Sequence, residues 1–180
     1  MENLKLEHIS SYLPYGLKAY GGISKRVYTM TCAETNAPDR YSIEKLCDEF
    51  MNLKPILRPL SDLTKEIVCN KVKIIPAIEI AKCIHGAYEH VQNIKVEFTK
   101  SGNSIKISSN VGNLGSIHIN MVESCLHSIK YKHAYDINAY TFLEIQNLLH
   151  KWKFDYQGLI DQGLAINVNS LKENCYEVYS

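Results

Sequence analysis

The chain has 180 residues, of which 46% are hydrophobic and 22% charged, and its formal net charge is +1. This length and composition are typical of one globular domain that buries its own core. The balanced charge excludes a broad positive field for nucleic acid or anionic lipid, and no run of about 18 apolar residues could span a membrane.

The N-terminal part of the chain predicts a turn followed by a hairpin. Residues 13–17 predict the turn, because proline presets one backbone dihedral and glycine supplies a positive one. Residues 17–20 and 25–32 predict two strands around Gly21 and Gly22. A polar, proline-containing loop is expected to follow.

The next segment combines a predicted helix with a stiff extended stretch. Residues 41–51 have apolar side chains at helical spacing. Residues 53–60 must be extended, because each proline biases its predecessor away from the helix. A helical turn capped by Ser61 or Asp62 is predicted after them.

The middle of the chain predicts a series of hairpins. Residues 67–69 and 72–75 flank a two-residue turn at Asn70 and Lys71, which favours one hairpin. Residues 94–98 and 105–108 alternate between apolar and polar side chains on either side of a turn at 101–103, which favours a second. A helix is predicted over residues 76–86, because Pro76 stands at its start and proline is common at the first position of a helix. Residues 116–119 favour a further strand, and the spacing of apolar residues over 122–129 favours a short helix.

The strongest helix is predicted over residues 138–153, with Asn138 as its cap. Residues 164–168 predict a closing strand, and a polar tail over 172–180 is expected to fray. The elements do not alternate regularly between strand and helix. The sequence therefore predicts one α+β domain over residues 1–180, with a mostly antiparallel sheet built from hairpins and a few helices.

Three stretches carry a resemblance to a known family. They are residues 12–17 (YLPYGL), residues 54–67 (KPILRPLSDLTKEI) and residues 158–165 (GLIDQGLA). The chain resembles a widespread family of uncharacterised small proteins encoded by phages, prophages and mobile elements of gut Bacteroidetes. The resemblance implies a phage-associated accessory protein in the cytoplasm of the host cell, and it implies no activity.

The proline-containing stretch holds a candidate anion site made of Arg58, Ser61, Asp62 and Lys65. A stiff backbone lowers the entropy cost of presenting the Arg58 guanidinium to a phosphate or carboxylate. The free amides of the following helical turn could also hold an anion. The alternative is a structural loop in which Arg58 pairs with Asp62 and Ser61 caps the turn.

A second candidate surface contains Lys130, Tyr131, Lys132, His133 and Tyr135. Tyrosine suits protein interfaces because one end of the side chain is apolar and the other forms hydrogen bonds. The same cluster could stack on bases and contact phosphates. The alternative is an aromatic rim around the core.

Neither a catalytic motif nor a metal motif is present in the sequence. Cys125 and His127 form a close pair of a thiol and a possible base; a helix would point them apart, whereas a strand would place them on the same face. The six cysteines lack zinc-ribbon or dithiol spacing, and the seven histidines lack His-x-His or His-x-x-x-His spacing. We therefore expect free thiols, no metal and no cofactor, and a cytoplasmic protein without a signal peptide.

These observations leave three hypotheses about function. The first is a non-catalytic phage protein that binds a host protein, such as a counter-defence inhibitor. The second is a protein that sequesters a small ligand such as a nucleotide, and the third is a nucleic-acid-binding module. An enzyme is the weakest interpretation, a membrane partner is not expected, and a homo-oligomer is compatible with the sequence.

Overall fold

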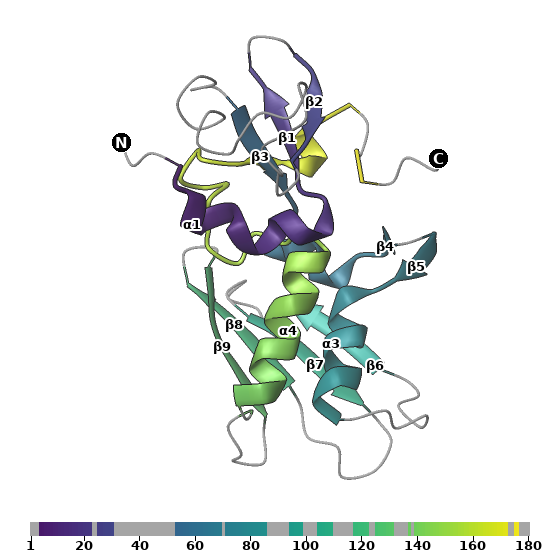
Figure 1. Cartoon of the computed structure of the whole chain (residues 1–180). Coiled ribbons are helices and arrows are strands. Elements are labelled where there is room, and N and C mark those ends of the chain that lie inside the picture. The colour runs from purple at the N-terminus through teal and green to yellow at the C-terminus, as the bar shows by residue number, and fades with distance from the viewer. Residues whose placement is uncertain are drawn as a thin grey trace.

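In the residues that it describes, the computed structural model shows an α+β fold of two four-stranded sheets, one separate hairpin and a few helices, which confirms the predicted fold class (Figure 1). The predicted helix over residues 41–51 and the predicted loop before it lie outside the residues that the structure describes. The described residues are 4–22, 25–30, 53–69, 71–85, 94–98, 104–109, 117–122, 125–131, 137, 139–172 and 175–176.

The first sheet joins distant parts of the chain in the order β10-β3-β1-β2. Strand β1 (Lys18–Gly21) pairs antiparallel with both β2 (Val27–Thr29) and β3 (Leu53–Leu57), which confirms the predicted N-terminal hairpin. Strand β10 (Ile166–Asn167) pairs parallel with β3. The end of the chain therefore returns to its first half.

A short helical segment packs on this sheet. It consists of α1 (Leu6–Ile9) and the 3-10 helix η1 (Ser10–Tyr15), which ends at Gly16 with a φ of 69°. A Cβ at Gly16 would meet nothing within 4 Å, so the positive φ alone favours glycine there. The core between these elements consists of Ile9, Tyr12, Leu13, Leu17, Ala19, Met30, Leu57, Leu159 and Ala165.

The second sheet is an antiparallel meander in the order β6-β7-β8-β9. Its strands are β6 (Ile94–Phe98), β7 (Ser104–Ser109), β8 (Ile117–Val122) and β9 (Cys125–Tyr131). Alternate side chains of the inner strands are buried, as period-two patterning requires. These buried positions are Ile105, Ile107, Ile117 and Ile119.

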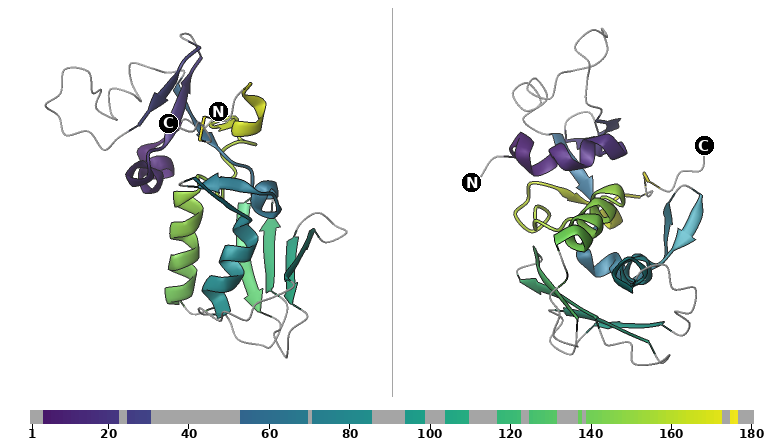
Figure 2. Two further views of the ribbon diagram at one scale, coloured as in Figure 1. Left: turned by 90° about the vertical axis from the view of Figure 1, so that its right-hand side faces the viewer. Right: turned by 60° about the horizontal axis from the view of Figure 1, so that its bottom comes forward.

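Two helices cover one face of this meander (Figure 2). They are α3 (Pro76–His85) and α4 (Ala139–Lys151), and α4 is the long helix that the sequence predicts. Their apolar faces bury Ile80 and Ile145 against the isoleucines of the sheet. Tyr156 packs against this core and against the core of the first sheet, which connects the two halves.

The predicted short helix over 122–129 is wrong, because that stretch belongs to β8 and β9. Ile119 pairs with Ile129, yet Met121, two residues further along β8, pairs with Leu126, three residues earlier in β9. This β-bulge puts Leu126 and Ile129 against the same core. The three-residue spacing of Leu126 and Ile129, which resembles that of a helix, therefore reflects a bulge in a strand.

Several short elements lie outside the two four-stranded sheets. The 3-10 helix η2 (Leu60–Thr64) follows β3, and β4 (Ile67–Cys69) pairs with β5 (Val72–Ile74) in the hairpin that the sequence predicts. The 3-10 helix η3 (Val168–Ser170) follows β10. Within the described residues, no helix is long and apolar enough to cross a membrane.

Candidate functional site

The three stretches that carry the family resemblance meet at one place in the structure. Arg58 forms a parallel bridge with Phe154, in which the Arg58 amide donates to the Lys153 carbonyl at 2.7 Å and the Asp155 amide donates to the Arg58 carbonyl at 2.8 Å. The hydroxyl of Tyr12 donates to the Phe154 carbonyl at 2.8 Å. Residues 153–155 therefore connect the first and second of these stretches.

The third stretch is held by a buried carboxylate. Asp155 accepts hydrogen bonds from the amides of Leu159 and Ile160, at 2.9 and 2.7 Å. On the other side, the Lys54 ammonium donates to the Gly163 carbonyl at 2.5 Å. The proline-containing segment and the glycine-bracketed turn thus lie against each other.

The end of helix α4 places a lysine in a backbone conformation that glycine usually adopts. The amide of Phe154 donates to the Leu149 carbonyl and the amide of Lys153 to the His150 carbonyl, the two bonds of a Schellman motif. Lys153 has a φ of 61°, in the left-handed region. A side chain there costs roughly 1–2 kcal/mol of backbone strain.

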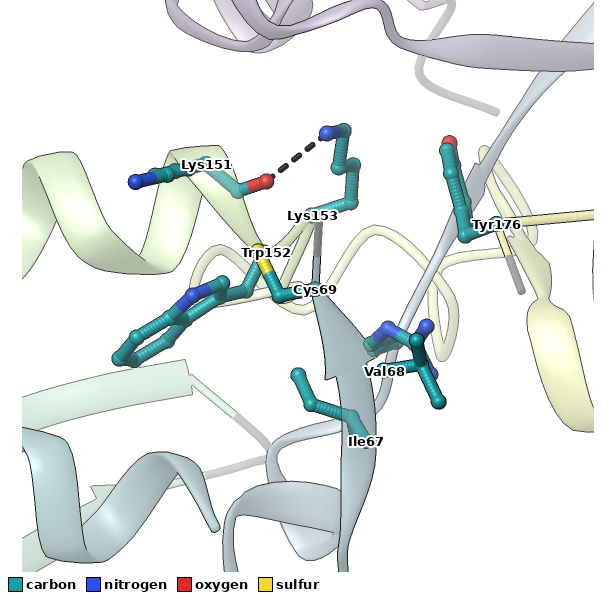
Figure 3. Close-up of a pocket in the computed structure, with 8 residues that line it drawn as sticks. Ile67, Val68, Cys69, Lys151, Trp152, Lys153 and Tyr176 are labelled. Atoms are coloured by element: carbon teal, nitrogen blue, oxygen red, sulfur yellow. Dashed lines mark hydrogen bonds between the residues drawn. The ribbon is translucent and has the colours of Figure 1, made fainter. Parts of the chain in front are cut away.

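A partly open pocket of about 90 Å³ lies beside this lysine (Figure 3). Arg58, Lys151 and Lys153 supply three cations, and none of the described residues that line the pocket is acidic. Arg58 is only 3% exposed, so the surrounding protein fixes its position. The remaining lining residues are Ile67, Val68, Cys69, Trp152 and Tyr176.

Tyr176 brings the C-terminal tail to the pocket. Its ring centroid lies 5.4 Å from the Lys153 ammonium, 5.8 Å from that of Lys18 and 5.9 Å from the Arg58 guanidinium carbon. Burial raises the pKa of the Tyr176 hydroxyl above its ordinary value, which keeps the phenol protonated. The tail, which we expected to fray, is therefore packed at Cys175 and Tyr176.

The surroundings of Lys153 disfavour its charged form. Partial burial lowers its pKa first, and the positive charges of Arg58, Lys18 and Lys151 lower it further. The Cys69 thiol acts in the opposite direction. The ammonium of Lys153 donates to the Lys151 carbonyl at 2.8 Å.

Of the four predicted anion-site residues, Arg58 is the one that lines the pocket. Asp62 is buried, with its carboxylate 2.6 Å from the Lys65 ammonium and 2.7 Å from the Asn169 amide nitrogen. Ser61 is exposed and lies inside η2, whose N-cap is Pro59, so the predicted cap at Ser61 or Asp62 is wrong. Asp62 therefore has a structural role that joins η2 to η3.

The predicted tyrosine-rich surface lies mostly outside the described part of the chain. Lys130 and Tyr131 belong to β9, where Lys130 pairs with His118 and Tyr131 with Ile117. Lys132, His133 and Tyr135 are not among the described residues. The structure therefore leaves this candidate surface as a prediction.

The cysteines of the described part of the chain are free thiols, and Cys125 lies in strand β9. The Cys125 thiol donates to the Gln157 carbonyl at 3.1 Å. No group of three or more His, Cys, Asp or Glu side chains among the described residues could hold a metal ion.

Sequence reasoning missed Lys151, Lys153, Cys69 and Tyr176. Two lysines at the end of a helix are typical of cations that stabilise the helix dipole, so they gave no separate signal. The one available sign was the lack of glycine after α4. Comparison with protein-family models, curated proteins and solved structures gives no match. The phage-family resemblance therefore stays a prediction.

Proposed function

We propose that the protein binds a small anionic ligand, with a phosphate or carboxylate group, in the pocket formed by Arg58, Lys151 and Lys153. The observation that carries the proposal is a partly open pocket that Arg58, Lys151 and Lys153 help to line, and whose described lining has no acid. Oxyanions accept charge-assisted hydrogen bonds from such groups. A nucleotide, the ligand class considered from the sequence, has a group of this kind.

The charge distribution supports binding, because the cations repel one another. Arg58, Lys18 and Lys151 all lower the pKa of Lys153, which means that their charges disfavour its protonated form. An anion between them would relieve that repulsion. Binding should therefore stabilise the fold and weaken as salt screens the charges.

Thermal unfolding at constant ionic strength tests the proposal, with inorganic phosphate, pyrophosphate and a nucleotide panel as ligands. We expect a concentration-dependent rise in Tm. Arg58→Gln and Lys153→Gly should weaken binding about tenfold or more, because a hydrogen bond to a charged group contributes roughly 1.5–3 kcal/mol.

Lys25→Gly is the matched control. Lys25 also has a positive φ, 57°, but it lies in the exposed turn after β1 and does not line the pocket. It should keep the full response. A Tm that no anion raises, or a rise that Lys153→Gly retains, would contradict the proposal.

A second candidate function, binding to a host protein, is favoured by the outer face of α4. Tyr140 and Leu143 are 71% and 57% exposed, and their spacing places them on one side of the helix. Large apolar side chains on a helix suit a protein partner. A stoichiometric host partner should be lost from Tyr140→Ser/Leu143→Ser, and equal recovery by that variant would exclude this face.

A further inference from the structure

We infer that the polar face of the meander formed by β6, β7, β8 and β9 is a binding surface for double-stranded RNA. A row of lysines on this face contacts the phosphates, and a neighbouring row of serine and asparagine side chains contacts the 2′-hydroxyl groups. The surface is separate from the pocket at Arg58, so the inference goes beyond the proposed function.

The two faces of the meander differ in what covers them. Helices α3 and α4 lie on one side, and no described helix or strand lies on the other (Figure 2). Successive side chains of a strand point to opposite faces, so the residues between the inward-facing apolar ones form the second, polar face. Among the described residues, this polar face includes Lys95, Glu97, Ser104, Lys106, Ser108, His118, Asn120 and Ser128.

Lysines form one row across the polar face. Lys106 pairs with His118, and His118 pairs with Lys130, so the three positions follow one another from β7 to β9. Lys95 lies on β6, where it pairs with Ser108. Lys95 and Lys106 are exposed, and neither forms an ion pair with another described residue. Within the described part of the chain, their charges are therefore available to the phosphates of a partner.

Hydrogen-bonding side chains form the next row of the polar face. Ser104 pairs with Asn120, and Asn120 pairs with Ser128. The Asn120 side-chain amide donates to the Ser128 hydroxyl at 3.0 Å, so the two side chains lie on the same face. This bond occupies a lone pair of the Ser128 oxygen and leaves its hydrogen and the Asn120 carbonyl oxygen for other partners. A 2′-hydroxyl group both donates and accepts hydrogen bonds, so it fits these two atoms.

The composition of the polar face favours duplex RNA over other nucleic acids. Single strands bind to aromatic side chains that stack on their bases, and none of the described residues of the polar face is Phe, Tyr or Trp. A-form RNA has a wide, shallow minor groove that displays 2′-hydroxyl groups beside the phosphates, and an open sheet face can lie against it. The two rows match these two groups, whereas duplex DNA lacks the second.

Fluorescence anisotropy of a labelled RNA duplex of about 16 base pairs tests the inference, with duplex DNA of the same sequence and a single strand as comparisons. We expect binding to duplex RNA at low salt, at least about threefold tighter than to duplex DNA, because hydrogen bonds to 2′-hydroxyl groups are added. The logarithm of the RNA association constant should fall with that of the salt concentration, with a slope of about −2 to −3 for three lysine contacts.

Charge variants on the polar face have matched controls elsewhere in the chain. Lys106→Gln should weaken RNA binding and reduce the magnitude of the salt slope by about one. Lys25→Gln removes the same charge from the exposed turn after β1 and should change neither.

A gain of affinity is the sharper test, because a variant that fails to fold cannot mimic it. Glu97 is exposed and pairs with Lys106, yet no ion pair joins the two side chains, so its charge repels a phosphate at this row. Glu97→Lys should tighten RNA binding. Glu7→Lys, which makes the same change on helix α1, should not.

Two further variants separate the parts of the inference. Ser128→Ala should lower the preference for RNA and leave DNA binding unchanged. Lys153→Gly alters the pocket and should bind RNA as the wild type does, so the anion-induced rise in Tm and the RNA titration fail independently. The inference would be overturned by a lack of RNA binding at low salt, by equal affinity for the two duplexes, or by equal effects of Lys106→Gln and Lys25→Gln.

Discussion

The hydroxyl of Tyr176 donates to the backbone carbonyl of Ile56 at 2.8 Å, 120 positions earlier in the chain. The same oxygen accepts from the amide of Lys18 at 2.9 Å. These two bonds fix the ring that the cations of Lys18, Arg58 and Lys153 face. The C-terminal tail is therefore part of the pocket wall.

Tyr176→Phe should lower the free energy of unfolding by about 1–3 kcal/mol, because it removes two hydrogen bonds and leaves the Lys18 amide without this partner. The ring and its contacts with the cations remain. Urea unfolding measures the change. Tyr176→Leu, which also removes the ring, should be less stable than Tyr176→Phe, and equal stability of all three proteins would show that the tail does not hold the sheet.

His150 should make the fold less stable in mild acid. Burial lowers the pKa of its imidazole, whose Nε2 is 2.9 Å from the Tyr156 hydroxyl and whose ring contacts Tyr12 edge-on. The folded state therefore favours the neutral ring, and the unfolded state takes up the proton more readily. Stability should fall as pH decreases below the ordinary value of 6.5 and level off below the folded pKa.

The measurement is urea unfolding of the wild type and His150→Gln between pH ~7.5 and ~5. The variant is expected to lose stability from the missing ring at every pH. Its curve should nevertheless be flatter, because the titrating group is gone. Parallel curves would assign the acid sensitivity to other groups.

Asp155 should have the opposite effect on stability, which it should increase in acid. Burial raises the pKa of its carboxyl group, although the hydrogen bonds from Leu159 and Ile160 partly offset the effect. The folded state therefore binds this proton more tightly than the unfolded state does. The contribution is complete below the ordinary value of 3.8 and is lost as pH rises through the folded pKa.

Asp155→Asn separates the charge from the hydrogen bonds. An amide oxygen can accept from the backbone, but its NH₂ group cannot, so one bond is lost at a cost of about 1 kcal/mol. Unfolding between pH ~3 and ~6 should show a smaller loss of stability with rising pH in the variant. A steeper loss in the variant would reverse the sign argued here.

The hairpins and the long helix could be predicted because their signals are local. Residues 94–98 and 104–109 alternate about a turn, and α4 repeats its apolar side chains at helical spacing. Strand β9 could not be predicted, because a bulge opposite Met121 shifts the alternation of its buried and exposed side chains. The position of that bulge depends on the pairing with β8. Local patterns therefore determine element type only where pairing is regular.

The candidate site could be predicted only in part, because it is assembled from distant segments. Arg58 was found from the prolines that stiffen its backbone. Lys153 and Tyr176 come from the end of α4 and from the tail, and sequence spacing does not place them beside Arg58. The left-handed φ of Lys153 belongs to the Schellman motif at the end of α4, and the Lys153 carbonyl accepts from the amide of Arg58 just after β3.

Glu144 should control the chemistry of a cysteine on the neighbouring helix. The Cys83 thiol lies 3.4 Å from a Glu144 carboxylate oxygen, and burial, followed by the hydrogen bond and the charge of Glu144, raises the pKa of Cys83 to about 11. Glu144→Gln removes the charge and leaves the burial. The pKa of Cys83 should therefore fall toward its ordinary value of 9.0 without reaching it.

The pH dependence of alkylation at Cys83, followed by peptide mapping with iodoacetamide, measures this pKa. Alkylation at Cys83 should begin at lower pH in Glu144→Gln than in the wild type. Cys125 is the internal control, because its thiol donates a hydrogen bond to the Gln157 carbonyl and lies on a strand, away from the contact between Cys83 and Glu144. An unchanged profile at Cys83 would mean that burial alone raises its pKa, and an equal shift at both cysteines would indicate that the variant loosens the fold.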